Sequence, residues 1–173
     1  LIGTVVGRAG YVKNLHGQKN VYYQVNATYY SAMGEDDRKM LLARAIQLFM
    51  PGKPQVWYLD LFVGKNDYAA MERAGKDGHK EINRTNLSPA DVEAGLKKQV
   101  VLDQLELLRL RNTQKVFSAD AAISAETDGS RLRLTWRTAQ EIACLDADLE
   151  SFGFAVTVSD NASGKETYRF TQA

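Results

Sequence analysis

A proline at position 51 separates two segments with different hydrophobic patterns, and this junction constrains the fold most. Before it, Glu35–Met50 carries apolar residues at three- and four-residue spacing, which predicts an amphipathic helix with acidic residues at its start. Pro51 disfavours helical geometry at Met50 and ends the helix. After it, Val56–Phe62 is an almost continuous apolar run, broken by Asp60, which predicts a strand buried on both faces. We therefore expect an α/β fold with a parallel sheet.

Residues 63–87 follow that strand with little periodicity and predict a long loop. In a parallel α/β barrel, the loop after a strand lies at the end of the barrel where substrates bind. The polar residues of this loop are therefore candidates for function. They are Lys65, Asn66, Asp67, Glu81, Asn83 and Arg84.

Composition excludes several classes of partner. Lys and Arg total 22 and Asp and Glu total 21, so the net charge of +1 gives no electrostatic reason to expect nucleic acid or an anionic membrane. No apolar run approaches the roughly 20 residues that span a bilayer. A single cysteine, Cys144, fits a reducing compartment, and we expect a cytoplasmic protein. His16, His79 and Cys144 show no metal-ligand spacing, so we expect no metal or cofactor.

Other segments predict the remaining elements. Leu1–Gly10 is typical of a helix end, Tyr11–Gln18 of a loop and Val21–Tyr30 of an extended segment. A capping box predicts a helix start at Ser88, with Pro89 in the first turn, Asp91 at the box position and Gly95 closing a short segment. The next predicted helix, Gln99–Arg111, carries an apolar stripe. The stripe consists of Val101, Leu105 and Leu108, with Leu102 beside them.

After residue 112 the hydrophobic period changes from helical to alternating. The alternating sets lie around Arg131–Arg137, Ile142–Leu149 and Phe152–Val158, and turn residues separate them. This pattern predicts a small antiparallel β module that begins near residue 113 and docks its inner face on the α/β part. Trp57 and Trp136 are expected to lie in the core.

Five blocks of the first part of the chain stand in a distinctive order. They are VYYQVNATYYSA at 21–32, ARAIQ at 43–47, PGKPQVWY at 51–58, GKND at 64–67 and EINR at 81–84. These blocks resemble segments of sucrose phosphorylases, a branch of the α-amylase superfamily (glycoside hydrolase family 13). The resemblance implies that residues 1–112 form the last segments of a TIM (β/α)8 barrel, including its eighth strand, and that 113–173 form a C-terminal antiparallel β domain.

The resemblance also implies an activity. Family enzymes transfer glucose from sucrose to phosphate with retention, so the expected partners are sucrose or a related α-glucoside and phosphate. Retention needs two carboxylates about 5–5.5 Å apart. In the family both lie upstream of the loop that contains Tyr22–Gln24, and an Asp that follows a His lies shortly before it. No His-Asp pair occurs in this chain. We therefore expect this chain alone to lack the nucleophile and the acid, and we expect the whole protein to catalyse the reaction.

The resemblance assigns substrate-binding roles to two segments. Tyr22, Tyr23 and Gln24 match the family's acceptor-site loop, where Val21 stands in place of the family's Asp. Asn83 and Arg84 match an Asn-Arg pair whose arginine reaches the glucosyl site. These assignments make the substrate-binding prediction Val21, Tyr22, Tyr23, Gln24, Asn83 and Arg84.

Asp60 stays open between two interpretations from the residues alone. It could bond a sugar or support a neighbouring arginine, or it could be a buried carboxylate that backbone or Arg satisfies.

Two further alternatives remain. The chain could be a non-catalytic carbohydrate-binding or interaction domain. Within the enzyme interpretation, the acceptor or donor could differ, for example phosphorylated sucrose, glucosylglycerol or glucosylglycerate, and plain hydrolysis is also open. We also expect self-association, or a need for the rest of the barrel, because a lone barrel strand cannot cover both of its faces.

Overall fold

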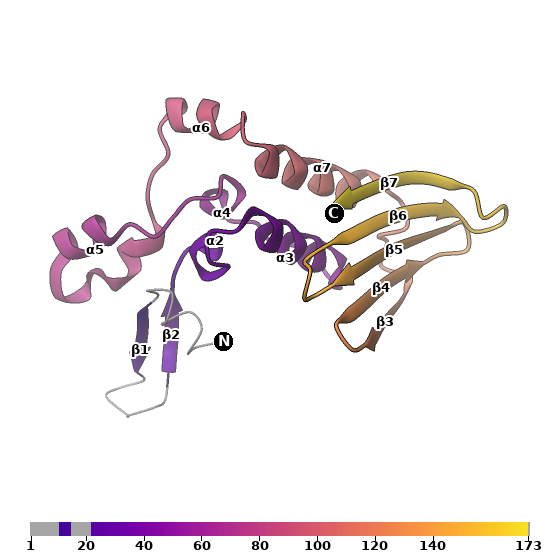
Figure 1. Cartoon of the computed structure of the whole chain (residues 1–173), viewed down its shortest axis with the longest axis horizontal. Coiled ribbons are helices and arrows are strands. Elements are labelled where there is room, and N and C mark those ends of the chain that lie inside the picture. Colours follow the sequence, from indigo (N-terminus) through magenta and orange to yellow (C-terminus); the bar gives the residue numbers. More distant parts are fainter. Residues whose placement is uncertain (1–10, 15–21, 173) are drawn as a thin grey trace. The chain divides into compact units, whose positions relative to one another are not determined.

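The computed structural model describes residues 11–14 and 22–172, with side chains for residues 24–75 and 78–172. The chain divides into two compact units (Figure 1). The first holds Val56–Leu102 and the described residues up to Met40, and the second holds Leu41–Gln55 and the described residues from Asp103 onward. The predicted helix end in Leu1–Gly10 lies outside the described residues.

The first unit begins with a hairpin and continues through short helices. The strands β1, residues 11–14, and β2, residues 22–26, pair antiparallel. The predicted extended segment is therefore confirmed for β2. The loop predicted for residues 11–18 is wrong at 11–14, because these residues form β1. In chain order the elements are β1 (Tyr11–Asn14), β2 (Tyr22–Asn26), α2 (Tyr29–Ala32), the start of α3 (Asp37–Phe49), α4 (Tyr58–Leu61), α5 (Tyr68–Ala74), η2 (Gly75–Asn83), α6 (Pro89–Gly95) and the start of α7 (Gln99–Thr113).

The predicted helix before Pro51 is confirmed as α3. Asp36 caps it, because its Oδ1 accepts hydrogen bonds from the backbone N–H groups of Arg38 (2.9 Å) and Lys39 (3.1 Å). The apolar face is also as predicted: Leu41, Leu42, Ala45, Leu48 and Phe49 are buried and Ile46 is half-buried.

The strand predicted for Val56–Phe62 is wrong. The chain is irregular up to Trp57 and then turns into α4, where the N–H groups of Leu61 and Phe62 donate to the carbonyls of Trp57 and Tyr58. Apolar runs of this length do not distinguish a strand from a buried helical turn, and contacts with distant residues decide between them. Here the Tyr58 hydroxyl donates to the Thr85 carbonyl at 2.7 Å, and Leu59 is buried.

The long loop predicted for residues 63–87 is also largely wrong, because α5 and η2 occupy most of it. Asp67 caps α5 by accepting from the backbone N–H of Ala70 at 2.8 Å. The next predicted start is confirmed: Ser88 and Asp91 form a capping box at α6, which ends at Gly95.

The second unit is built around a five-stranded antiparallel sheet. The strands are hydrogen-bonded in their chain order, as Figure 1 shows, so the sheet is a simple meander. The predicted β module is thus confirmed, although its first strand begins nine residues after α7 ends. The strands are β3 (Ala122–Asp128), β4 (Arg131–Arg137), β5 (Glu141–Asp148), β6 (Phe154–Asp160) and β7 (Glu166–Gln172).

One face of this sheet packs against α3 and α7 in a common core. Leu134 and Trp136 of β4, Leu145 of β5 and Val156 of β6 are buried there, with Phe49 from α3. The docking of the inner sheet face on helices is therefore as predicted. Trp136 is core, as expected, but Trp57 is 50% exposed and lies against the Tyr58 ring at 4.8 Å, so its predicted core position is wrong.

The apolar stripe predicted for α7 is partly wrong. Leu102 is 43% exposed and Leu105 is only half-buried, whereas Gln104 is fully buried. Gln104 Oε1 accepts from Nε of the buried Arg44 at 2.9 Å. A polar pair from two helices therefore rotates the buried face of α7. That face contains Val100, Val101, Gln104, Leu107 and Leu110.

Two absences hold for the part of the chain that the structure describes. None of its helices combines the length and apolar character that crossing a bilayer requires. No group of His, Cys, Asp and Glu within residues 11–14 and 22–172 is arranged to hold a metal ion. The boundary proposed at residue 112 between barrel and β domain stays a prediction.

Candidate functional site

The β1–β2 hairpin carries the predicted acceptor-site residues. Lys13 lies opposite Gln24 and Asn14 lies opposite Tyr22, so the register skips Tyr23 and forms an irregularity there. Bulges of this kind redirect side chains and occur often beside active sites. Val21 lies outside the described residues.

Two amide side chains on β2 have buried atoms that lack partners. Gln24 Oε1 and Asn26 Nδ2 find no hydrogen-bond partner among the described residues, and Asn26 is only 1% exposed. Residues two apart in a strand lie on one face. Since buried polar groups are normally satisfied, this face of β2 requires a further hydrogen-bonding partner. His79 Nε2, in η2, is likewise unpartnered within the described residues, and η2 contacts β2.

Asn83 and Arg84 lie at the end of η2, beside the end of β2. Asn83 Nδ2 donates to the carbonyl of Ala27 at 3.2 Å. Arg84 is 55% exposed, and its Nη1 lies 3.7 Å from Glu81 Oε1. An exposed ion pair of this kind contributes about 0–1 kcal/mol, so the guanidinium can exchange it for a ligand's oxygens at little cost.

Asp60 has a backbone partner. Its Oδ1 accepts from the N–H of Tyr29 at 2.7 Å, and its side chain is half-buried. Tyr29 opens α2, and the first N–H groups of a helix have no partner inside the helix. The structure therefore favours the interpretation of Asp60 as a carboxylate that the backbone satisfies.

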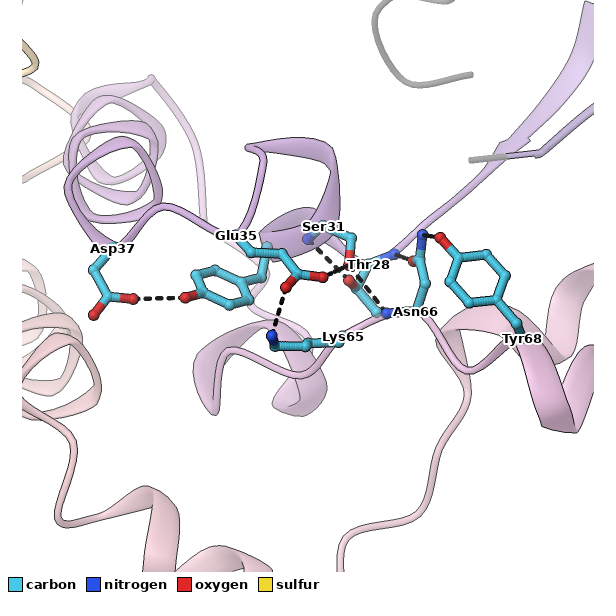
Figure 2. A network of polar contacts seen from close by, with 8 residues as sticks. Thr28, Ser31, Glu35, Asp37, Lys65, Asn66 and Tyr68 are labelled. Atoms are coloured by element: carbon cyan, nitrogen blue, oxygen red, sulfur yellow. Dashed lines mark hydrogen bonds and ion pairs between the residues drawn. The ribbon is translucent and has the colours of Figure 1, made fainter. Parts of the chain in front are cut away.

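A polar network links the segment after β2 with the loop before α5, and sequence reasoning did not assign it. Asn66 stands at its centre: Oδ1 accepts from Thr28 N–H at 2.7 Å, its own N–H donates to Ser31 Oγ at 3.0 Å, and Nδ2 donates to Tyr68 at 3.1 Å. Figure 2 shows these groups converging from α2 and from the loop. The signals in the sequence were the crowding of polar residues at 65–67 and the GKND block at 64–67, and neither indicated these contacts.

The same network continues to a strained turn. Ser31 Oγ donates to Glu35 Oε1 at 3.3 Å, and Lys65 Nζ lies 2.5 Å from Glu35 Oε2 (Figure 2). Glu35 has φ +57° and the β-branched Val63 has φ +50°, conformations that non-glycine residues rarely adopt. Strain of this kind persists where the surroundings over-determine the backbone, and it gathers at functional sites.

A tyrosine beside this turn has a perturbed pKa. Burial, with a 2.8 Å hydrogen bond that its hydroxyl donates to Asp37 Oδ1, raises the pKa of Tyr30 to about 12. Tyr30 therefore stays neutral at physiological pH and acts as a hydrogen-bond donor.

The second unit has cavities of its own. One of about 430 Å³ and one of about 340 Å³ open on the solvent face of β3, β4 and β5. The pair between Arg133 Nε and Asp146 Oδ1 crosses this face at 2.6 Å, so its charges already have partners. Neither cavity contains a predicted substrate-binding residue. The candidate site is therefore the polar region of the first unit, whose amide and guanidinium groups suit a hydroxyl-rich or anionic ligand.

Comparisons with known proteins identify what this arrangement resembles. No protein-family model matches the chain. The sucrose 6(F)-phosphate phosphorylase of Ilumatobacter coccineus is 57% identical over 160 residues, which cover 91% of this chain and 30% of that protein. The sucrose phosphorylase of Streptococcus mutans is 38% identical over 80% of this chain and 29% of its own length.

A solved structure agrees with these relatives. The crystal structure of sucrose 6F-phosphate phosphorylase from Thermoanaerobacter thermosaccharolyticum matches with a TM-score of 0.87 and 33% identity, over 99% of this chain and 34% of that one. The chain thus spans about a third of the length of the relatives it matches. The predicted fold class was the C-terminal part of a TIM (β/α)8 barrel followed by a small antiparallel β domain. The match confirms it as a C-terminal part of a sucrose phosphorylase, with helices and a five-stranded antiparallel sheet and without the full barrel. The chain belongs to the sucrose phosphorylase-like family and corresponds to a C-terminal portion of its members.

Proposed function

We propose that the whole protein is a retaining glucosyl phosphorylase that acts on a sucrose-type α-glucoside, with sucrose 6F-phosphate as the preferred donor. Phosphate accepts the glucosyl group, and the products are glucose 1-phosphate and fructose 6-phosphate. The observation that carries this proposal is the 57% identity to the sucrose 6(F)-phosphate phosphorylase of Ilumatobacter coccineus. A cytoplasmic location is part of the proposal.

Val21 supports a phosphorylated donor. In the resemblance drawn from the sequence, sucrose phosphorylases carry Asp at this position of the acceptor-site loop. A carboxylate there would repel a phosphate group on fructose, whereas the valine side chain carries no charge. Tyr22, Tyr23 and Gln24 supply hydrogen-bonding groups in the same loop.

We assign to Arg84 the binding of the anionic or hydroxyl-rich part of the substrate. Its side chain is 55% exposed, and its recorded ion pair among the described residues is with Glu81. Its fixed fork of donors suits two oxygens of a phosphate or a pair of sugar hydroxyls.

The test is a donor comparison with the whole protein. Glucose 1-phosphate is measured with sucrose 6F-phosphate and with sucrose at equal concentrations, with and without phosphate. We expect a higher kcat/KM for sucrose 6F-phosphate and a strict requirement for phosphate. Release of glucose independent of phosphate would remove the phosphorylase proposal, and an equal or higher kcat/KM for sucrose would remove the phosphorylated donor.

The variant Val21→Asp sharpens the donor test. If the charge at this position excludes the phosphorylated donor, the variant loses kcat/KM for sucrose 6F-phosphate and keeps more of it for sucrose. A proportional loss on both donors would contradict that role.

A further inference from the structure

Three consecutive residues after β2 are each held by a polar side chain from elsewhere in the first unit. The carbonyl of Ala27 accepts from Asn83 Nδ2 at 3.2 Å, and the N–H of Thr28 donates to Asn66 Oδ1 at 2.7 Å. The N–H of Tyr29 donates to Asp60 Oδ1 at 2.7 Å. The three side chains come from α4, the loop before α5 and η2, so three separate segments converge on one short stretch of backbone.

These contacts hold the backbone itself, and at a place where it would otherwise be weakly held. α2 has only four residues, with Thr28 as its N-cap, and so short a helix contributes little stability of its own. Thr28 is 1% exposed, and a buried backbone N–H without a partner is costly. Asn66 and Asp60 satisfy two N–H groups that the fold leaves open, and both distances are short for N–H···O bonds.

The clamped residues begin directly where β2 ends. Gln24, whose buried Oε1 has no partner within the part of the chain that the structure describes, is three residues before Ala27, and the register irregularity at Tyr23 lies one residue further back. A rotation of the backbone at residues 27–29 therefore displaces the strand that presents Gln24. Glu35 and Val63 take left-handed backbone conformations, with φ +57° and +50°, which non-glycine residues rarely adopt.

We infer that Asp60 and Asn66, together with Asn83, are positioning residues that fix the acceptor-site strand through the backbone of Ala27, Thr28 and Tyr29. This inference rests on the proposed function for its kinetic consequence only. It places Asp60 and Asn66 behind the site, where they act through Gln24 and its neighbours and do not touch the substrate.

The first arm of the test measures the clamp without any activity. In the whole protein, amide hydrogen exchange of a peptide covering Thr28 and Tyr29 is followed in Asp60→Ala, Asp60→Asn and Asn66→Ala. We expect faster exchange there in both alanine variants. Asp60→Asn keeps an acceptor oxygen and should restore the protection. Unchanged exchange in the alanine variants would overturn the clamp.

The second arm tests whether the clamp acts through Gln24. Asn66→Ala should lower kcat/KM for phosphorolysis about tenfold to a hundredfold, because a small displacement of a substrate-binding group is enough for such losses. In a Gln24→Ala background the same change should cost less than about twofold, because the group it positions is gone. Losses that simply multiply would assign Asn66 a role independent of Gln24 and overturn the inference.

Asn161→Ala is the matched control. Asn161 also bonds backbone groups, in its case the carbonyls of Thr138 and Ala139, but it lies in a turn of the second unit. It should lower stability without changing kcat/KM, and a loss equal to that of Asn66→Ala would show a general structural effect and overturn the inference. If the wild-type protein phosphorolyses none of the donors, the proposed function fails, and the exchange arm still decides whether the clamp exists.

Discussion

Replacing Trp136 by phenylalanine tests how the core of the second unit is held together. Trp136 is 3% exposed, and its Nε1 donates to the carbonyl of Phe49 at 2.8 Å. Phe49 is the last residue of α3, so its carbonyl has no partner within the helix. The indole also lies 5.5 Å from the Phe117 ring and beneath the Arg111 guanidinium at 4.4 Å.

The magnitude follows from what phenylalanine cannot replace. The phenylalanine side chain has no donor, so it leaves the buried Phe49 carbonyl unsatisfied, which costs about 1–3 kcal/mol. The smaller ring leaves a partial cavity, which costs about 1–2 kcal/mol. Weaker attraction to Arg111 costs about 0.5 kcal/mol. We therefore expect Trp136→Phe to lower the free energy of unfolding by about 2.5–5.5 kcal/mol.

Trp57→Phe is the matched control for this change. Trp57 is 50% exposed, and the same substitution there should cost less than about 0.5 kcal/mol. Both variants of the 173-residue chain are unfolded in urea at equal concentration and followed by far-UV circular dichroism. A loss below about 1 kcal/mol for Trp136→Phe, or equal losses for the two variants, would refute the reasoning from burial and the Phe49 hydrogen bond.

Three further predictions concern the first unit. Gly64→Ala would place a Cβ 2.2 Å from Leu59 Cδ1. Because Leu59 is buried, the variant should lose about 1–3 kcal/mol of stability. An unchanged thermal midpoint would contradict this prediction. Hydrogen bonds from Ser88 hold the pKa of the Asp91 carboxyl below its usual value. Ser88→Ala should therefore raise that pKa in an NMR titration and lower the stability by about 1 kcal/mol through loss of the cap. An unchanged pKa of Asp91 would argue against the capping box. Burial raises the folded-state pKa of Tyr30 to about 12, so the stabilising contribution of the neutral hydroxyl is complete below pH 10 and is lost as the pH rises to 12. Tyr30→Phe should therefore make the free energy of unfolding less dependent on pH between 10 and 12. An alkaline stability profile identical to that of the wild-type protein would exclude the effect.

The parts of the fold that sequence predicted are those that local chemistry decides. The Ser88 cap and the alternation of Leu134 and Trp136 are fixed by neighbours within a few residues, and both are confirmed. The strand predicted for Val56–Phe62 is wrong because an apolar run fits either a strand or a buried helical turn. Contacts 27 and 31 residues away, from Tyr58 to Thr85 and from Asp60 to Tyr29, stabilise the helical turn.

The prediction of the buried face of α7 was wrong for a related reason. A glutamine at position 104 looks like a solvent-facing residue in any local pattern. It is buried because Arg44, 60 residues earlier, supplies a hydrogen bond in the core. Hydrophobic periodicity cannot register a buried polar pair, so the predicted stripe was rotated toward Leu102, which the structure exposes.

The candidate site shows the same division between residue identity and residue role. Resemblance found Asn83 as a substrate-binding candidate, yet its recorded contact is with the Ala27 backbone, 56 residues earlier. Asp60 interrupted an apolar run, and the run alone could not tell a ligand-binding carboxylate from a backbone acceptor. Asn66 was a candidate as a polar loop residue in the GKND block, but nothing in the sequence indicated the three hydrogen bonds that it makes. Backbone groups are the same in every residue, so a side chain whose function is to hold backbone leaves no complementary residue type in the sequence. Such residues become visible only when the fold shows which N–H or C=O group stands opposite them.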